Sequence, residues 1–488
     1  MAEWGFYGRR DELEKLREIL SRGRWFFVKI AGRRRIGKTA LIRQALDGMT
    51  GRSVYYVQIP DSGEAGVISA VNDALDTFGV LPERHPRPRN MSEVAKLLEL
   101  LAESGYVVVL DEFQYFNRPA FAGFCSLLQA AADRLAAKAE QVRGGWVVLG
   151  SIHTEMTALL EERSAPLYGR VTNPLDLDHL DIASVLTILR EHADTTPERL
   201  LFLWTLFEGV PKFYRDAFEE GVLKTDRRPL LQKMFFDSSA PLQTEADTWF
   251  LREIGGKADT VLKFVARNPG MMHQELVNAI RDASGEETKN IGSYLKTLTE
   301  RYRLIERKLP IFAPDKARQG RYYVTDNFLA AWLAALGSRV SARTFRPVDQ
   351  LVAEADDGLA TVEGIGLEKL VGKLYEERSR RGISDFPLSR RICGYWDRKD
   401  TEIDLVAVNE GEKRIRFGSC KRSPNKLLSD ITNFKKHVDR FLNENRSYRQ
   451  WNVEYVGVSV RLNEDERKVL TRADIIPQSL EELTAGLS

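Results

Sequence analysis

The chain has 488 residues, of which 43% are apolar and 29% charged, a composition typical of a folded protein with several domains. Lysine and arginine total 72 against 70 acidic residues, a formal charge of +2. This balance argues against a surface built for nonspecific nucleic-acid binding, although a local basic patch stays open. Three scattered cysteines favour neither a disulfide framework nor a zinc site and suit a reducing cytoplasm. We expect neither a secretory signal nor an association with a membrane.

The first segment, residues 1–180, alternates apolar runs with stretches of helical spacing. Runs of the kind that buried strands need occur at residues 24–31, 53–58, 106–110 and 146–149. Strands that alternate with helices imply a parallel sheet covered on both faces. We therefore expect an α/β fold here.

The strongest motif follows the first apolar run. Residues 32–39, GRRRIGKT, match the pattern G-x4-G-K-S/T between a strand and a helix. Gly32 and Gly37 allow backbone N–H groups to turn toward phosphates, and the following helix adds its positive end. Lys38 should reach the β and γ phosphates, and Thr39 offers a hydroxyl to magnesium. The motif predicts a P-loop that binds ATP with Mg²⁺.

An acidic pair at the end of a later strand predicts the second half of this site. The apolar run ends in Asp111 and Glu112, where a parallel strand would emerge beside the P-loop. Asp111 would hold magnesium directly or through water, and Glu112 could polarise an attacking water. The strand at 146–149 leads to Ser151, which would place a small polar side chain near the γ-phosphate.

These motifs together resemble the archaeal-type ATPases, which belong to the signal-transduction (STAND) branch of the AAA+ P-loop ATPases. The segments that carry the resemblance are residues 6–13, 32–39, 110–116, 149–151, 166–170 and 209–213. The resemblance implies that Gly8 and Arg9 lie near the adenine, and that Arg170 approaches the phosphates. It also implies that Pro211 begins a lid helix that contacts nucleotide. From the residues alone, Arg170 fits an exposed salt bridge equally well.

The middle of the chain is predicted to be helical at first and then to form a winged helix. Residues 181–255 show helical spacing only, which predicts the lid. Residues 256–345 are predicted to be the winged helix, with a third helix marked by Ile291, Leu295 and Leu298 and with strands at 304–307 and 322–325.

The winged helix has two interpretations. Its third helix could enter a major groove, while the loop that carries Lys316 and Arg318 could contact phosphates, which makes DNA a candidate partner. However, the outer face of that helix carries Lys289 and Lys296 together with two glutamates. Because this mixture is weak for DNA, a structural element that packs on the ATPase is favoured.

The last part of the chain is predicted to be a separate domain. Residues 346–364 mix Pro, Asp, Gly and Ala and are predicted to be a linker. Residues 365–488 follow as a domain with strands at 402–408, 414–418 and 452–460.

This domain resembles the restriction-endonuclease-like domain appended to such ATPases, in which an aspartate on one strand precedes a carboxylate-x-lysine on the next. Asp404 and Lys421 match, Glu402 shares a strand face with Asp404, and Glu368 opens the preceding helix. Ser419 stands where the resemblance expects an acid, and a hydroxyl is a poor magnesium ligand. A degenerate sensor or interaction domain is therefore favoured over an active nuclease, with Ser419 leaving nuclease activity open.

The sequence thus predicts an α/β P-loop NTPase with a parallel sheet, a helical lid, a winged helix and a C-terminal α/β restriction-endonuclease-like domain. Its predicted function is a cytoplasmic, magnesium-dependent ATP switch that hydrolyses ATP slowly and reports its state to a partner, either DNA or an unknown protein. Two other functions are compatible with the sequence: an ATP-gated DNA nuclease and an ATP-dependent DNA-binding regulator.

Overall fold

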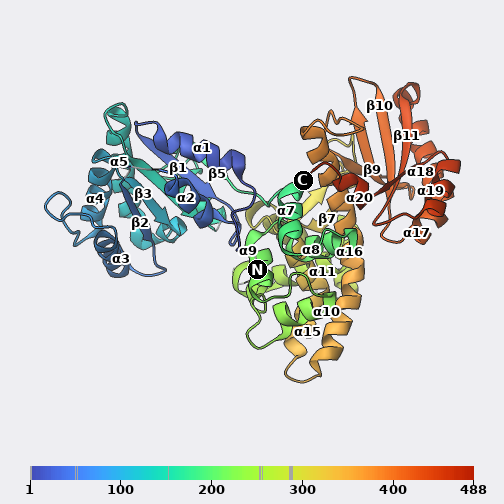
Figure 1. Cartoon of the computed structure of the whole chain (residues 1–488), viewed down its shortest axis with the longest axis horizontal. Coiled ribbons are helices and arrows are strands. Elements are labelled where there is room, and N and C mark those ends of the chain that lie inside the picture. Colours follow the sequence, from blue (N-terminus) through green and yellow to red (C-terminus); the bar gives the residue numbers. More distant parts are fainter. Residues whose placement is uncertain are drawn as a thin grey trace. The chain divides into compact units, whose positions relative to one another are not determined.

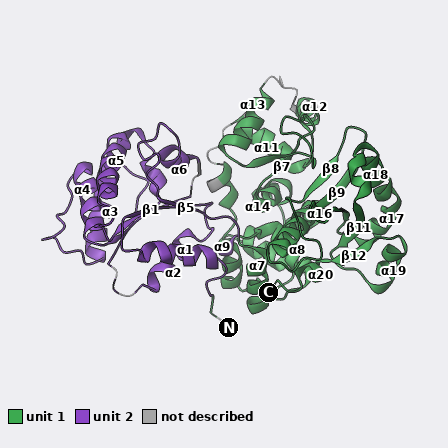
Figure 2. Cartoon of the chain, turned by 90° about the horizontal axis from the view of Figure 1, so that it is seen from above, with its two compact units in different colours: residues 1–4, 180–209, 213–488 green, residues 5–179, 210–212 purple. Residues whose placement is uncertain are grey.

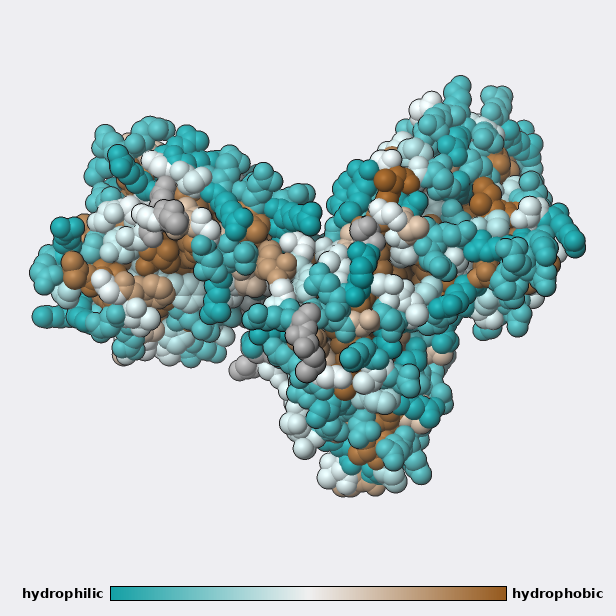
Figure 3. Space-filling view, in the orientation of Figure 1, coloured by the Kyte–Doolittle hydropathy of each residue, from teal (hydrophilic) through white to brown (hydrophobic). Residues whose placement is uncertain are grey.

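The structure, a computed structural model, describes residues 3–49, 51, 53–151, 153–251, 254, 256–284 and 290–487. The chain divides into two compact units (Figure 2). One comprises residues 5–179 and 210–212, and the other comprises residues 1–4, 180–209 and 213–488. Hydrophilic residues cover most of the face seen in Figure 3. Among the described helices, none combines the length and apolar character that a bilayer crossing requires.

The first unit is an α/β domain built on a five-stranded parallel sheet of order β2-β3-β4-β1-β5 (Figure 1). The strands are β1 (Phe26–Ala31), β2 (Val54–Gln58), β3 (Val107–Asp111), β4 (Gly145–Gly150) and β5 (Asn173–Asp176). The helices are α1 (Arg10–Ser21), α2 (Lys38–Asp47), α3 (Glu64–Thr77), α4 (Met91–Glu103), α5 (Ala122–Ala137) and α6 (His153–Leu160). The predicted parallel α/β sheet is confirmed.

The central strands are buried along their whole length because they have neighbours on both faces. Trp146 of β4 and Phe27 of β1 share one core with α3, α4 and α5. Lys29 interrupts the apolar run of β1, and its buried amine forms ion pairs with Glu161 at 2.5 Å and Asp176 at 2.6 Å. Burial lowers the pKa of this amine, but these two carboxylates outweigh that effect and raise the pKa overall.

The sequence predicts that the strand ending at Asp111 emerges beside the P-loop, and Asp111 Oδ2 lies 3.1 Å from Thr39 Oγ1 of that loop. The order of the strands was not predicted: β4 lies between β1 and β3. All three runs are continuously apolar, so periodicity cannot tell which of them are neighbours. As a result Ser151, which directly follows β4, comes after the strand that lies between the P-loop strand β1 and the Asp111 strand β3.

The second unit begins with helices and continues with a helical and hairpin segment. The first helices are α7 (Ile182–His192), α8 (Pro197–Phe207), α9 (Pro211–Glu219), whose first two residues belong to the other unit, α10 (Arg227–Leu231), η3 (Gln232–Phe236) and η4 (Asp247–Leu251). Next come α11 (Lys257–Arg267), α12 (His273–Ser284), α13 (Ile291–Lys296), η5 (Thr297–Arg301), β6 (Ile305–Lys308) and β7 (Arg321–Val324). β6 and β7 pair antiparallel within one residue of the two predicted strands.

A continuous helical stretch follows β7, formed by α14 (Asn327–Ala331), η6 (Trp332–Leu336) and α15 (Gly337–Ala342). The composition of residues 346–364 predicts a linker, but these residues begin α16 (Val348–Arg380), a helix of 33 residues. Gly358, which lies in this segment, serves close packing instead, because a Cβ there would lie 3.2 Å from the Ala335 Cβ. Gly366, further along α16, packs even more closely, since a Cβ there would lie 2.7 Å from Thr205 Oγ1.

The last part of the chain folds on a five-stranded mixed sheet of order β12-β11-β10-β9-β8. β8, β9 and β10 pair antiparallel, whereas β10, β11 and β12 pair parallel. The strands are β8 (Cys393–Trp396), β9 (Glu402–Asn409), β10 (Arg414–Cys420), β11 (Asn452–Ser459) and β12 (Ile476–Ser479). The covering helices are α17 (Pro424–Ser429), α18 (Ile431–Glu444), η7 (Arg446–Gln450), α19 (Glu464–Arg472) and α20 (Leu480–Thr484).

Candidate functional site

The loop between β1 and α2 is shaped by its two glycines. Gly32 has φ 155° and Gly37 has φ 97°, both in a region that side chains disfavour. A Cβ at Gly32 would lie 2.6 Å from the Leu177 carbonyl oxygen, so no larger residue fits there. Gly37 is the residue immediately before α2, and its left-handed conformation turns the chain into that helix. The loop therefore presents backbone N–H groups at a helix N-terminus.

Lys38 spans this loop with its side chain. Its Nζ donates to the carbonyl oxygens of Gly32 at 2.9 Å and Arg33 at 3.1 Å. The side chain is buried, and burial lowers the pKa of the amine to about 8, while the charges of Glu112 and Asp111 act in the opposite direction. A buried ammonium held by neutral carbonyls gains strongly from an incoming anion.

Asp111 is the centre of a hydrogen-bond network at the end of β3. Its Oδ2 accepts from Thr39 Oγ1 at 3.1 Å and from Tyr56 Oη at 2.6 Å, and its Oδ1 accepts from the Glu112 N–H at 2.8 Å. The structure thus brings together the hydroxyl and the carboxylate that the sequence assigns to magnesium. Tyr56 was not predicted here, because a tyrosine on a neighbouring strand carries no local signal for this contact.

Gln114 is a second residue that the sequence analysis missed. It is buried, its Nε2 donates to the Glu112 carboxylate, and its Oε1 accepts from the Ser151 N–H at 3.2 Å. Glu112 itself has φ 57°, a rare conformation for a residue with a side chain. Gln114 therefore joins the ends of β3 and β4 and fixes the position of the Glu112 carboxylate.

Two of the residues implied by the family resemblance border the P-loop. Gly8 and Arg9 form a tight turn with φ 65° and 60°, and Arg9 Nη2 donates to the Ile36 carbonyl at 3.4 Å and also to the Asp178 carbonyl. A Cβ placed at Gly37 would lie 3.6 Å from Pro211 Cγ, so the proline ring lies against the loop. The position of Gly8 and Arg9 near the adenine stays a prediction, and so does the contact between nucleotide and the helix that begins at Pro211.

Arg170 has a different partner. Its Nε and Nη2 donate to the two carboxylate oxygens of Asp133 at 2.9 and 3.0 Å, and its Nη1 donates to the Tyr168 carbonyl at 2.8 Å. This is the salt-bridge arrangement that the residues alone allow. An approach of Arg170 to the phosphates stays a prediction.

The C-terminal candidate residues lie close together. Asp404 Oδ2 accepts from Lys421 Nζ at 2.7 Å and from the Cys420 N–H at 2.8 Å. The Glu368 side chain is exposed. The pKa of its carboxyl is nevertheless raised well above the ordinary value, because surrounding protein removes water from the charged form and because Asp404 is negatively charged. Glu368 lies within α16 rather than opening a helix as the sequence predicts, because the helix begins at Val348.

The geometry of this cluster differs from a ready metal site. Glu402 forms an ion pair with Arg321 of β7 at 2.5 Å, and this arginine lowers the pKa of Glu402 although burial opposes the shift. Glu368, Glu402 and Asp404 are all described residues, and their carboxylate oxygens do not gather within 4.8 Å of one another. The buried Ser419 hydroxyl has no hydrogen-bond partner among the described residues.

The loop between β6 and β7, predicted to reach for phosphates, is attached to the C-terminal sheet. The Ile311 N–H donates to the Gly394 carbonyl at 2.9 Å, and Trp396 Nε1 donates to the Gln319 carbonyl at 2.7 Å. Lys296 is exposed and lies 3.8 Å from Glu300. Lys289 lies outside the described residues.

The first strand of the parallel sheet leads into a glycine loop and a helix, and an acid from β3 is bonded to the threonine of that loop. These features define a P-loop ATPase domain. Residues 6–213 match the family described as an ATPase domain predominantly from Archaea. Residues 332–455 match a second family, described as archaeal and bacterial proteins of unknown function.

Three archaeal proteins are among those similar to this chain. An uncharacterized protein of Methanocaldococcus jannaschii is 24% identical over 450 residues, which cover 89% of this chain and 92% of that protein. The Walker-type ATPase of Pyrococcus abyssi has 17% identity and a TM-score of 0.51, over 67% of this chain and 96% of that one. The ORC2 protein of Aeropyrum pernix has 14% identity and a TM-score of 0.46, over 74% of this chain and 97% of that one. The likeness to the Pyrococcus ATPase shows a shared fold.

Proposed function

We propose that this chain is a magnesium-dependent ATP switch, which binds ATP at the P-loop and resets by slow hydrolysis. The observation that supports this function best is the 3.1 Å bond between Thr39 Oγ1 and Asp111 Oδ2, next to the buried ammonium of Lys38. Hydroxyl and carboxylate oxygens are donors that Mg²⁺ prefers, so Thr39 and Asp111 fit the ion.

The residues of the site have separate roles in this proposal. Backbone N–H groups of the P-loop orient the phosphates, and Lys38 places its charge against the β and γ phosphates. When bound, Mg²⁺ supplies charge neutralisation at the same oxygens. Glu112, held by Gln114, polarises the attacking water. Ser151 follows the end of β4, and its N–H donates to the same Gln114 side chain.

Titration calorimetry with Lys38→Ala tests the nucleotide site. Loss of the ammonium should abolish measurable ATP binding in the presence of Mg²⁺, while Lys138→Ala, which removes an exposed lysine of the same unit, should bind as the unaltered chain does. Circular dichroism verifies that both variants fold. ATP affinity unaltered by Lys38→Ala would remove the site assignment and the switch with it.

We further propose that α16 relays the nucleotide state within the second unit. Glu377 of α16 accepts from the N–H groups of Ile182 at 2.9 Å and Ala183 at 3.2 Å, at the start of α7. The buried Glu363 of α16 forms ion pairs with Arg227 of α10 and, at 2.9 Å, with Arg422 after β10. One helix therefore binds both the helical segment predicted to be a lid and the C-terminal sheet.

Hydrogen exchange tests this relay. ATP should change the exchange of backbone amides after β10 in the unaltered chain, and Glu363→Gln should remove that change while ATP affinity stays the same. The relay is wrong if ATP leaves these amides unaffected in the unaltered chain, or if the variant responds like it.

For the C-terminal domain we propose an interaction role in place of nuclease activity. Ser419 replaces the expected acid, Arg321 neutralises Glu402, and the three carboxylates lie too far apart to share one ion as they stand. Duplex DNA incubated with the chain, ATP, and Mg²⁺ or Mn²⁺ should stay intact. Cleavage that disappears in both Asp404→Ala and Lys421→Ala would establish the nuclease instead, and specific retention without cleavage would favour a DNA-binding regulator.

A further inference from the structure

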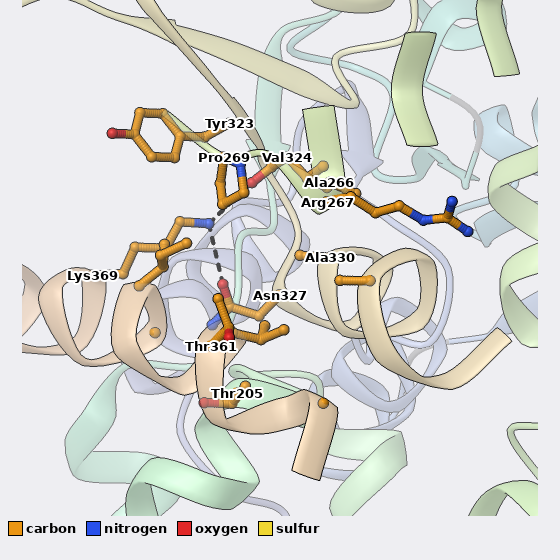
Figure 4. A pocket seen from close by; sticks show the side chains of 15 residues that line it. Thr205, Ala266, Arg267, Pro269, Tyr323, Val324, Asn327, Ala330, Thr361 and Lys369 are labelled. Atoms are coloured by element: carbon orange, nitrogen blue, oxygen red, sulfur yellow. Dashed lines mark hydrogen bonds between the residues drawn. The ribbon is translucent and has the colours of Figure 1, made fainter. Parts of the chain in front are cut away.

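A cavity of about 190 Å³ lies inside the second unit, beside the glycines of α16 that pack against neighbouring helices (Figure 4). One wall is a face of α16 that carries Thr361, Ile365 and Lys369 at a spacing of four residues. The other walls combine small apolar side chains such as Val324 and Ala330 with polar ones such as Asn327. Because an apolar cavity of roughly 150 Å³ suffices for benzene, this one accommodates a body the size of a single ring.

Lys369 gives this apolar cavity a positive charge. Its Nζ donates to the carbonyl oxygens of Val324 and Thr325 and to Asn327 Oδ1, each at 3.1 Å. All three acceptors are neutral, and burial lowers the pKa of the amine. Figure 4 shows the amine pointing toward Asn327, while the Arg267 side chain extends away from both. The three N–H groups of the Lys369 ammonium are thus used by neutral acceptors, so its charge adds to the positive potential of the cavity while its donors are already bonded.

A second, larger and more open cavity of about 490 Å³ lies next to this one. Arg267 and Ala334 line both cavities, so the two are neighbours. The outer cavity is lined by three arginines and a single acid, Glu354, which forms an ion pair with Arg346 at 2.5 Å. Arg339 Nη1 donates to the neutral Ala335 carbonyl. Arg267 and Arg339 therefore leave an excess of positive charge at the outer end.

We propose that the joined cavities bind a small amphipathic anion. Its ring-sized apolar body occupies the inner cavity, and its carboxylate or phosphate group lies at Arg267 and Arg339. The planar guanidinium matches both kinds of oxyanion through paired N–H donors. The ligand contacts α16 together with α11 and β7, so it stabilises the packing of the relay helix on its neighbours.

Titration calorimetry with the full chain tests this site, using 4-phenylbutyrate and phenyl phosphate as probes. We expect saturable binding of at least one probe, and binding of the neutral 4-phenylbutanol should be about tenfold weaker, since a charge-assisted hydrogen bond is lost. Arg267→Gln should weaken the anionic probe by about tenfold and leave the alcohol unaffected. Arg281→Gln, which alters an exposed arginine of α12, is the matched control and should change neither.

A second variant tests whether the probe binds in the inner cavity. Ala334→Phe should fill the space and abolish binding of acid and alcohol alike, and unaltered ATP affinity together with circular dichroism verifies its fold. If Ala334→Phe fails to fold, Arg267→Gln decides alone. The proposal is overturned if neither anionic probe binds, if the acid and the alcohol bind equally, or if Arg267→Gln binds the anion normally.

Discussion

The P-loop and the C-terminal cluster use the same kinds of side chain and differ in how their charges are paired. At the P-loop, Lys38 is bonded only to backbone carbonyls, and Asp111 is bonded to two hydroxyls and an N–H group. In the C-terminal cluster, Lys421 is neutralised by Asp404, and Glu402 is neutralised by Arg321. The first arrangement leaves charge for a ligand, whereas the second satisfies most of its charge internally. A lysine and carboxylates in proximity therefore define a ligand site only when they are not already each other's partners.

The largest expected effect separates chemistry from binding at the first site. Glu112→Gln keeps the size of the side chain but removes the group that polarises water, so ATP hydrolysis should fall by about 100-fold or more. ATP affinity should change little, because the phosphates are held by Lys38 and the loop. Phosphate release and calorimetry measure the two quantities. A variant that hydrolyses ATP normally would exclude Glu112 as the catalytic residue.

Asp404→Asn tests the internal pairing of the second site. Lys421 would lose its ionic partner, which should lower the free energy of unfolding by about 2 kcal/mol in a denaturant titration. ATP binding should not change. A more stable Asp404→Asn chain would mean that Asp404 is a strained acid held in readiness for a cation, and the contrast between the sites would fail.

Gln114→Ala should have an intermediate effect. Without its amide, Glu112 is free to move, so hydrolysis should slow by about tenfold while ATP affinity is preserved. Steady-state kinetics separate the two. As a control, Gln141→Ala alters an exposed amide of the same unit and should leave hydrolysis unchanged. Equal rates for the two variants would show that Gln114 only contributes to folding.

The smallest effect comes from restoring an acid to the second site. Ser419→Glu adds a carboxylate near Asp404 and should lower the melting temperature in the presence of a chelator, because like charges repel. Mg²⁺ or Mn²⁺ should raise it again by a few degrees more than in the unaltered chain. If divalent ions stabilise both chains equally, the domain has no latent metal geometry.

The sequence predicted those parts of the molecule that depend on local patterns. The P-loop was found because Gly32, Gly37, Lys38 and Thr39 lie within eight consecutive residues and need only a strand before and a helix after. Thr39 and Asp111 were paired correctly without any prediction of the strand order, because parallel strands end at one edge of the sheet.

The missed features depend on tertiary contacts. Tyr56 and Gln114 act through bonds to residues of other segments, which a single sequence does not encode locally. The linker prediction failed because glycine occurs both in flexible segments and where helices pack closely, and Gly358 allows two helices to approach rather than the chain to bend. Burial against α8 and η6 outweighs the low helix propensity of glycine in α16.

The hairpin loop between β6 and β7 has a consequence for any attempt to divide this chain. Ile311 belongs to the hydrophobic core of the C-terminal sheet, although more than fifty residues of other structure separate it from β8 along the chain. A fragment beginning after α16 would lack this side chain, the bond from its N–H to the Gly394 carbonyl and the bond from Trp396 Nε1 to the Gln319 carbonyl. We therefore expect such a fragment to aggregate, because the core of its sheet is left open where Ile311 packs in the whole chain.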